Sequence, residues 1–271
     1  MIRNYLTIDV EDYYQVSAFE KVCGPGRWDG YPSRVVANTE RILEALDRYG
    51  VKATFFVLGW TASRFPHLVR KIDGKGHEIG CHSYYHRLVY TLSPEEFRRD
   101  TAQAKETLEQ ITGKEVRGYR APSYSIVRGC GWAFDILEEL GFRFDSSIFP
   151  IRHDRYGVPD APRFRYEVPG RRLVEYPLST VLLWDRRIPV AGGGYFRLFP
   201  YWFVRRSLAA INRREREPFV FYLHPWETDP GQPRIRGAGP LSKFRHYVNL
   251  AKTAPRFEQL LNDFAFGPLH G

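Results

Sequence analysis

The amino-acid sequence predicts an α/β protein with a mostly parallel sheet or barrel. Two observations support this prediction: strand-like and helix-like segments alternate from residue 1 to about 150, and helix-like segments stop at glycines such as Gly50 and Gly113. Parallel strands joined by helices follow this alternation, because a crossover must carry the chain back before the next strand begins. Functional side chains of such folds lie at the carboxyl ends of the strands.

The elements of this first half follow in order along the chain. Apolar runs predict strands at residues 5–10, 52–59, 77–83, 116–123 and 143–150. Amphipathic periodicity predicts helices at residues 32–51, 62–76, 93–113 and 131–142. The third helix has the clearest boundary, because Ser93 is a good N-cap and Pro94 occupies the first helical position.

Residues 151–215 break this alternation. They are rich in proline, glycine and aromatic residues, and they predict short strands or a hairpin followed by a basic helix. A strand at 218–227 resumes the sheet, and a helix at 254–264 follows. We therefore expect a single domain over residues 1–271, with an insertion at 151–215 that shapes a substrate groove and a C-terminal extension at 228–271.

The charge balance indicates which partners to expect. Lys and Arg total 40 and Asp and Glu total 31, which gives a net charge of +9. This excess favours an acidic partner, such as an anionic glycan or a lipid surface. The basic residues are spread along the chain without a dense block, so nucleic-acid binding is not expected.

Cysteine content and the N-terminal residues bear on location. The three cysteines, Cys23, Cys81 and Cys130, are odd in number and unpaired in spacing, which argues against a disulfide framework or a structural zinc site. The first residues lack the apolar stretch of a signal peptide, and no run is long enough to span a membrane. We expect cytoplasmic action, including at the inner face of the membrane, where the net charge favours peripheral contact with anionic lipids. No oligomeric state is predicted.

Polar side chains cluster where predicted strands end. The segment LTIDVEDYYQ (6–15) places Asp9, Glu11 and Asp12 directly after the first strand, and HSYYHR places His82 and His86 after the third. Histidines four residues apart on a helical turn share one face, within reach of a single ion. The segments RAPSYS, DSS and YLHPW also follow strands, so a parallel barrel would gather all five segments around one mouth.

The order of these five motifs resembles the polysaccharide deacetylase homology domain of carbohydrate esterase family 4. The variants DVEDYYQVSAFE, RAPSYSI and FYLHPWETDP are most similar to the exosortase-associated deacetylase branch, which is related to a peptidoglycan-deacetylase and allantoinase-like subgroup. The resemblance spans about residues 5 to 230. It implies a metal-dependent N-deacetylase on a distorted (β/α) barrel of about seven parallel strands, usually with zinc or a similar divalent cation.

The resemblance assigns the acidic residues after the first strand. Asp9 matches the family's general base, and Asp12 matches the aspartate that binds the metal with His82 and His86. An Asp with two His is a three-ligand set that leaves positions for water and a substrate carbonyl. The family's two aspartates are usually adjacent, but two residues separate them here, and on a continuing strand Glu11 would share a face with Asp9. Asp12 is favoured because the strand is expected to end by residue 10, and Glu11 is the alternative.

Further roles follow from the same resemblance. Arg120 would hold the base carboxylate ionised and oriented. The backbone of Ser123 or of Tyr124 would form the oxyanion hole. His224 would be the general acid that protonates the leaving amine, and Asp145 would be the partner that stabilises its imidazolium form.

Aromatic and basic residues suggest how a sugar would be held. Trp226, at the end of the strand at 218–227, would wall the acetyl pocket. In the insertion, GGGYFRLFPYW (192–202) offers Tyr195 for sugar faces and Arg197 for an acidic sugar.

These expectations define three hypotheses about function. The first is hydrolysis of N-acetyl groups from amino sugars of a cell-surface glycan, an exopolysaccharide or a lipid-linked precursor, with a divalent metal, zinc above all. The second is hydrolysis of a small cyclic amide or ureide, as in the allantoinase-like subgroup. The third is a catalytically inactive glycan-binding module, although such a module has no need of both an acid and a base.

Overall fold

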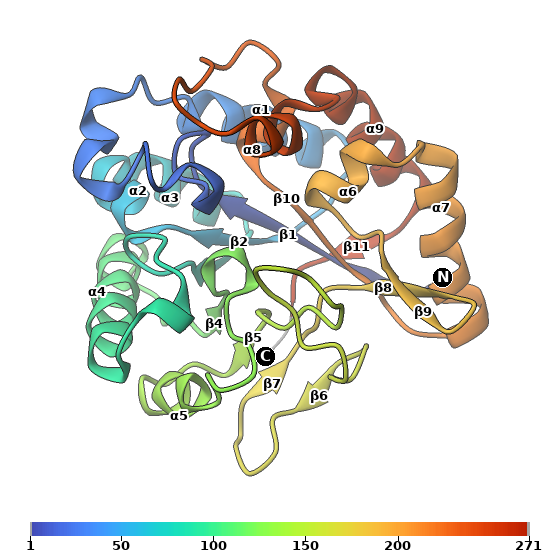
Figure 1. Ribbon diagram of the computed structural model, residues 1–271, viewed down its shortest axis with the longest axis horizontal. Coiled ribbons are helices and arrows are strands. Elements are labelled where there is room, and N and C mark those ends of the chain that lie inside the picture. Colours follow the sequence, from blue (N-terminus) through green and yellow to red (C-terminus); the bar gives the residue numbers. More distant parts are fainter. Residues whose placement is uncertain (1, 270–271) are drawn as a thin grey trace.

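A curled sheet of mostly parallel strands forms the centre of the computed structural model, which describes residues 2–269 (Figure 1). The strand order is β10-β1-β2-β3-β4-β5-β7-β6, with β11 also paired to β1, and only β6 runs antiparallel to its neighbour. Within residues 2–269 no pairing joins β10 to β6, so the sheet curls without closing. The strands are β1 (Asn4–Val10), β2 (Thr54–Val57), β3 (Glu78–Cys81), β4 (Gly118–Tyr119), β5 (Phe144–Asp145), β6 (Tyr166–Glu167), β7 (Val174–Glu175), β10 (Val220–Leu223) and β11 (Phe266–Gly267).

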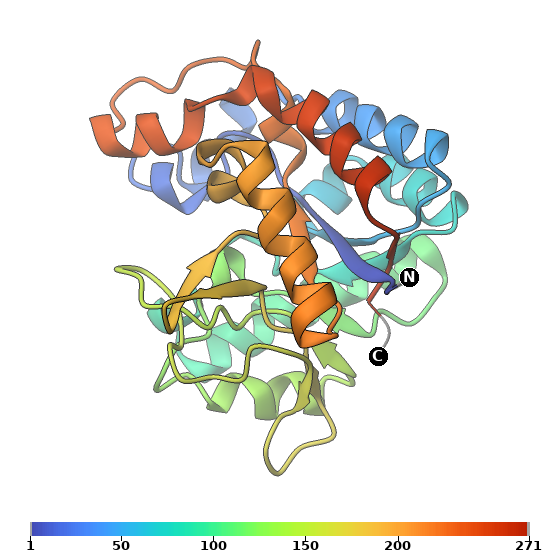
Figure 2. The same cartoon turned by 90° about the vertical axis from the view of Figure 1, so that its right-hand side faces the viewer.

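The α/β class and the mostly parallel sheet predicted from the sequence are confirmed, and the distorted barrel takes the form of an open half-barrel. Helices lie around the outside of the curl (Figures 1 and 2). They are α1 (Val35–Arg48), α2 (Gly59–Arg64), α3 (Pro66–Gly74), α4 (Pro94–Thr112), α5 (Trp132–Glu139), α6 (Gly193–Leu198), α7 (Tyr201–Ala210), α8 (Pro240–Tyr247) and α9 (Leu250–Asp263). None of the helices within residues 2–269 combines the length and apolar character needed to cross a bilayer.

Helix boundaries follow local chemistry. The Ser93 hydroxyl accepts a hydrogen bond from the Glu96 N–H while the Glu96 carboxylate accepts one from the Ser93 N–H, so α4 begins with a capping box as its sequence predicts. The single helix predicted at 62–76 is instead two helices, α2 and α3. The break falls at Phe65, with φ of −129°, because Pro66 disfavours helical geometry in the residue before it.

Strand β1 is central and covered on both faces. Leu6, Ile8 and Val10 belong to the main hydrophobic core between the sheet and the helices. The alternate residues, including Asp9, point to the other face, into the interior of the curl. Asp9 is in register with Phe56 of β2, which packs in the aromatic cluster on that inner side. The alternation of β1 therefore delivers a carboxylate to the inside of the half-barrel.

The segment after residue 150 is more irregular. Strand β7 extends the main sheet beside β5, while β8 (Thr180–Leu183) and β9 (Arg186–Pro189) form a separate antiparallel hairpin. Helices α6 and α7 follow, so the predicted hairpin before a helix is confirmed. After β10, α8 and α9 lead to β11, which pairs with β1. How the chain divides into domain, insertion and extension stays a prediction.

Candidate active site

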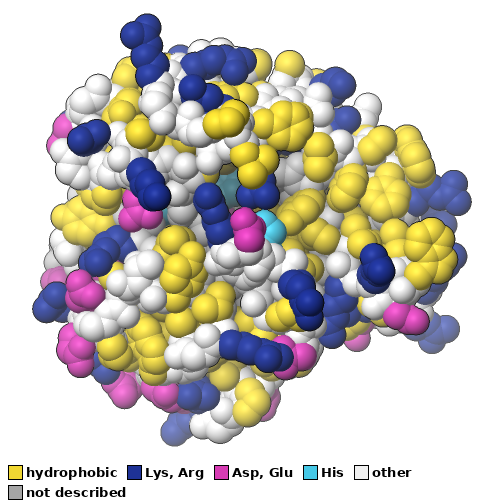
Figure 3. All heavy atoms as spheres, in the orientation of Figure 1, with side chains coloured by type: hydrophobic (Ala, Val, Ile, Leu, Met, Phe, Trp, Pro, Cys, Tyr) yellow, Lys and Arg dark blue, Asp and Glu magenta, His cyan; other side chains and the backbone are white. Residues whose placement is uncertain are grey.

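A cavity of about 450 Å³ opens at the carboxyl ends of the central strands (Figure 3). Its lining includes residues that follow β1, β3, β4 and β10, as the position of the motifs predicts. Ten of the predicted site residues line it: Asp9, Glu11, His82, His86, Ser123, Tyr124, Tyr195, Arg197, His224 and Trp226. Asp12, Arg120 and Asp145 do not line this cavity.

Glu11, His82 and His86 form a buried cluster whose ligand atoms all lie within 4.8 Å of one another. His86 Nε2 lies 2.7 Å from Glu11 Oε2. His82 donates from Nδ1 to the Arg120 carbonyl oxygen at 2.8 Å, so its Nε2 keeps a lone pair. Two imidazole nitrogens and one carboxylate oxygen are a donor set typical of catalytic zinc, which also needs open positions.

The protonation states in this cluster also fit a divalent cation. Burial would raise the pKa of Glu11, but the facing histidines, His86 first, hold it well below its usual range. Burial lowers the pKa of His82 to about 4. An ionised carboxylate and a neutral imidazole are the forms that bind metal. The residues present therefore fit the predicted cation.

The structure favours the alternative ligand, Glu11, over Asp12, because it is Glu11 that lies beside the two histidines. Asp12 Oδ2 accepts hydrogen bonds from Ser33 Oγ at 2.6 Å, from the Arg34 N–H at 2.9 Å and from the Val35 N–H at 3.2 Å. Asp12 therefore holds the start of α1, and its carboxylate is directed away from the two histidines. β1 does end at residue 10, as expected, but the carboxylate beside the histidines is that of Glu11.

Asp9 and Arg120 form a buried ion pair beneath the cavity. Arg120 Nη1 donates to Asp9 Oδ1 at 2.7 Å, and both side chains are almost fully buried. The guanidinium also donates to Thr7 Oγ1 and to the carbonyl and hydroxyl oxygens of Ser146, and it stacks 4.4 Å from the centre of the Phe56 ring. A guanidinium held on all sides fixes the orientation of the Asp9 carboxylate.

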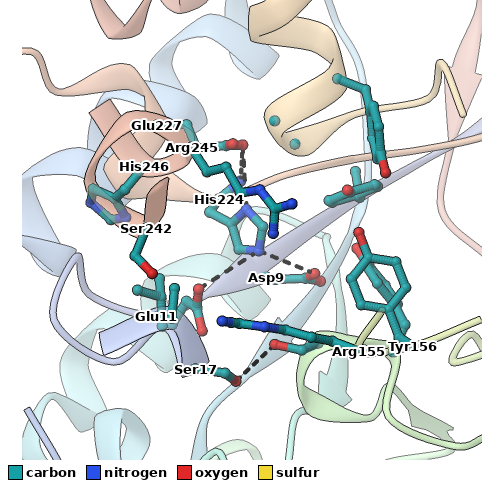
Figure 4. A pocket seen from close by; sticks show the side chains of 18 of the residues that line it. Asp9, Glu11, Ser17, Arg155, Tyr156, His224, Glu227, Ser242, Arg245 and His246 are labelled. Carbon is teal, nitrogen blue, oxygen red and sulfur yellow. Dashed lines mark hydrogen bonds and ion pairs between the residues drawn. The ribbon is translucent and has the colours of Figure 1, made fainter. Parts of the chain in front are cut away.

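His224 lies between the carboxylates of Asp9 and Glu11, at the end of β1. Its Nε2 is 3.6 Å from Glu11 Oε1 and 3.8 Å from Asp9 Oδ2 (Figure 4). Burial would lower the pKa of His224, but Glu227, followed by Glu11 and Asp9, outweighs it and raises that pKa to about 9. The imidazole is therefore protonated at neutral pH, which is the form that a general acid requires.

The carboxylate paired with His224 is that of Glu227, whereas no contact between Asp145 and His224 is found among residues 2–269, so the role assigned to Asp145 stays a prediction. Glu227 Oε2 lies 3.3 Å from His224 Nδ1 and accepts from the His224 N–H at 3.1 Å. Glu227, Glu11 and Asp9 are the main charges that raise the pKa of His224. The sequence signal for Glu227 was its position three residues after His224, in a helical turn that begins at Pro225.

Asp145 instead positions the loop after β4. It accepts from Ser147 Oγ at 2.6 Å, and the same Ser147 oxygen accepts from the Ala121 N–H at 2.8 Å. It also pairs in register with Glu175 of β7, and burial raises the pKa of both carboxyl groups. Asp145 therefore does not contact the cavity itself, but supports the backbone at Ala121, two residues before Ser123 in the cavity lining.

Arg197 lines the cavity, but its guanidinium is engaged within the protein, and its expected contact with an acidic sugar stays a prediction. Its side chain is 3% exposed, and Nε donates to Glu227 Oε1 at 3.0 Å. Nη1 donates to the backbone carbonyl oxygens of His246 and Val248, and Nη2 donates to that of Arg245. Arg197 holds Glu227 in place and ties α6 to α8.

Trp226 makes a hydrogen bond to Glu11 that was not predicted from the sequence. Its Nε1–H donates to Glu11 Oε1 at 3.1 Å, so it orients the carboxylate of the histidine cluster. Its ring stacks on His246 at 4.1 Å and on His224 at 5.3 Å between centroids. Since Trp226 also lines the cavity, its expected place as a wall of the acetyl pocket stays a prediction.

The turn after Arg120 offers one backbone donor to the cavity. Ser123 and Tyr124 both have positive φ, of 50° and 55°. The Tyr124 N–H donates to the Ala121 carbonyl at 3.1 Å, whereas no acceptor for the Ser123 N–H is found among residues 2–269. Of the two alternatives for the oxyanion hole, Ser123 is the one with a free N–H.

Two family models match the chain. Residues 28–144 match the polysaccharide deacetylase model, and residues 146–271 match a domain of unknown function, DUF3473. The chain is 37% identical over 147 residues to a peptidoglycan-N-acetylglucosamine deacetylase of Bacillus cereus, covering 50% of this chain and 53% of that protein. It is 31% identical over 84 residues to the peptidoglycan-N-acetylmuramic acid deacetylase PdaA of Bacillus subtilis, covering 31% of this chain and 32% of that protein. The matches thus span about half or less of these relatives.

Solved structures share the fold at low identity. A putative polysaccharide deacetylase from Mycobacterium smegmatis aligns with a TM-score of 0.55 and 21% identity, over 100% of this chain and 95% of that one. A family 4 carbohydrate esterase from Streptomyces lividans aligns with a TM-score of 0.53 and 15% identity, over 98% and 91%. The exosortase-associated branch stays a prediction. Residues 28–144 are therefore similar to the polysaccharide deacetylase family, and solved structures of polysaccharide deacetylases and of a family 4 carbohydrate esterase share the fold of the chain.

Proposed function

We propose that this protein is a metal-dependent hydrolase that removes N-acetyl groups from amino sugars of a glycan. One observation carries the proposal: a three-ligand cluster, a buried carboxylate base and a protonated histidine converge on one cavity. Amide hydrolysis needs these three parts, because water must be activated, the carbonyl polarised and the amine protonated as it leaves.

The residues of the chain divide the reaction between them. A divalent cation held by Glu11, His82 and His86 would supply Lewis acidity toward the acetyl carbonyl and the attacking water. Asp9 takes the proton of that water, and its ion pair with Arg120 fixes the orientation of its carboxylate at the cavity. The Ser123 N–H faces the oxygen that becomes negative in the tetrahedral state.

His224 completes the reaction as the general acid. It donates a proton from Nε2 to the sugar nitrogen when the C–N bond breaks, so that the amine leaves as a neutral group. Glu227 faces Nδ1 of the same ring and stabilises the imidazolium before the transfer. Arg197 keeps Glu227 in this position.

The rim of the cavity supports a glycan with negative charge. Arg155 and Arg245 are exposed and line the cavity, and Figure 4 shows both beside it. Neither guanidinium is in an ion pair within residues 2–269. Aromatic side chains of Tyr156, Tyr195 and Phe244 line the same rim, as is common in sugar binding. A cell-surface glycan, an exopolysaccharide or its precursor with acidic groups fits this lining.

Acetate release tests this proposal. Metal-stripped and zinc-restored protein would be assayed on an N-acetylated chitin-type oligosaccharide and on polymeric N-acetylated glycan, with His82→Ala beside them. His67→Ala is the matched control, since His67 is exposed on α3. We expect activity only with metal, lost in His82→Ala and kept in His67→Ala. A tightly bound metal without acetate release would favour a small cyclic amide as substrate, and absence of metal binding would favour a glycan-binding module.

A further inference from the structure

The β8–β9 hairpin, which contacts α7, exposes apolar side chains at its tip. At the tip of β8–β9, Leu182 is 45% exposed, Leu183 36% and Trp184 96%. An isolated apolar side chain on a surface is ordinary, but three in succession at a hairpin tip are not.

The turn of this hairpin is unfavourable for the residue that occupies it. Trp184 and Asp185 connect the paired residues Leu183 and Arg186, and both have positive φ, of 45° and 59°. Two-residue hairpin turns with this geometry favour Asn and Gly, and a bulky side chain in the left-handed region is costly. The turn would be more stable without the tryptophan, so the exposed indole needs an explanation outside the hairpin.

Helices α6 and α7 extend this apolar surface. Trp202 in the first turn of α7 is 63% exposed, and Leu198 at the end of α6 is 50% exposed. Helix α7 contacts β8, and Figure 3 shows apolar side chains gathered on the right of this face, where Figure 1 draws these elements. We call Leu182, Leu183, Trp184, Leu198 and Trp202 the apolar patch.

Basic side chains accompany the apolar patch. Exposed arginines follow the turn and line α7 and its end, and none of these four forms an ion pair within residues 2–269: Arg186, Arg206, Arg213 and Arg214. Asp185 is the acidic residue of the hairpin turn. Exposed apolar side chains together with unpaired arginines on the same elements complement a bilayer surface that contains anionic lipid.

We propose that the apolar patch docks on a bilayer surface that contains anionic phospholipid. A second copy of the chain is a poorer occupant, because a symmetric interface would bring the arginines of both copies together. One residue of the apolar patch, Leu198, lines the cavity, as does the exposed Phe244. Docking would bring the cavity mouth to the lipid headgroups. The substrate that fits this position is a lipid-linked amino sugar, and this extension rests on the proposed function.

Vesicle flotation tests the docking. The full chain would be mixed with vesicles of phosphatidylcholine alone or with phosphatidylglycerol, at low and high salt. Trp184→Asn is the decisive variant, because asparagine suits the turn and should keep or raise the melting temperature. Tyr49→Ser is the matched control, since Tyr49 is 37% exposed at the end of α1, outside the patch.

We expect flotation with phosphatidylglycerol that weakens at high salt and falls about tenfold in Trp184→Asn but not in Tyr49→Ser. Absence of flotation, or equal flotation of Trp184→Asn, would overturn the proposal. A dimer in light scattering that Trp184→Asn dissociates, without vesicle binding, would assign the patch to a second copy and also overturn it. Acetate release from a water-soluble oligosaccharide reports on the proposed activity independently of membrane docking. Trp184→Asn should leave this release unchanged, because Trp184 is outside the cavity.

Discussion

The floor of the cavity is buried and holds the ion pairs Asp9–Arg120 and Glu11–His86, whereas two arginines of the rim, Arg155 and Arg245, are exposed and form no ion pair within residues 2–269. On the floor, Asp9, Arg120 and Glu11 are each at most 2% exposed, and neighbouring side chains fix their orientation. On the rim, Arg155 and Arg245 face solvent. Paired floor residues suit chemistry that requires fixed geometry, and free rim residues suit recognition of a variable polymer.

The largest effect is expected from the floor, at Glu11. Glu11→Ala should lower zinc affinity and acetate release by at least about 100-fold, because it removes one of three ligands. Asp12→Asn should keep metal binding while it lowers the melting temperature, because Asp12 holds the start of α1. Metal content and thermal unfolding of the two variants check this. The reverse pattern would restore Asp12 as the ligand.

The second effect concerns stability of the floor. Arg120→Met should lower the free energy of unfolding by about 3–5 kcal/mol, because it leaves the buried Asp9 carboxylate without its partner. Denaturant unfolding measures this. Addition of Asp9→Asn to Arg120→Met should recover part of the loss, and no recovery would show that the cost lies in packing against Phe56.

The third effect appears in the pH profile. His224 is protonated below its pKa of about 9, so kcat/KM should fall as pH rises through that value. Glu227→Gln removes the first of the charges that raise the pKa of His224, and should move this fall to lower pH. A profile whose alkaline limb is unchanged by Glu227→Gln would contradict the pairing. Arg197→Lys should move the alkaline limb less than Glu227→Gln does, because it only weakens the contact that holds Glu227 in place.

The smallest effect is expected from the rim. Arg155→Ala should raise KM for an acidic glycan about three- to tenfold with kcat nearly unchanged, because an exposed charge contributes mainly to binding. The difference should shrink as salt rises. A neutral chitin-type oligosaccharide is the control substrate and should show little change. An equal loss on both substrates would assign Arg155 to the chemistry.

Much of the fold and part of the site could be predicted from the sequence. The alternation of strands and helices, the capping box of α4 and the histidine pair after β3 depend on residues close in the chain. The split between α2 and α3 was missed although Pro66 signals it, because the apolar periodicity runs through the break. Sequence patterns predict helices and strands well because capping residues and apolar periodicity act between residues close in the chain.

The tertiary structure alone decided which side chains meet. Glu11 rather than Asp12 joins the histidines because the start of α1 lies beside β1 and binds the Asp12 carboxylate. Glu227 serves His224 because Arg197, thirty residues away in sequence, holds it there. The sequence by itself determined the donors available at the strand ends. Their pairing depended on distances between segments far apart in the chain, since a buried charge is stable only beside the partner that folding brings to it.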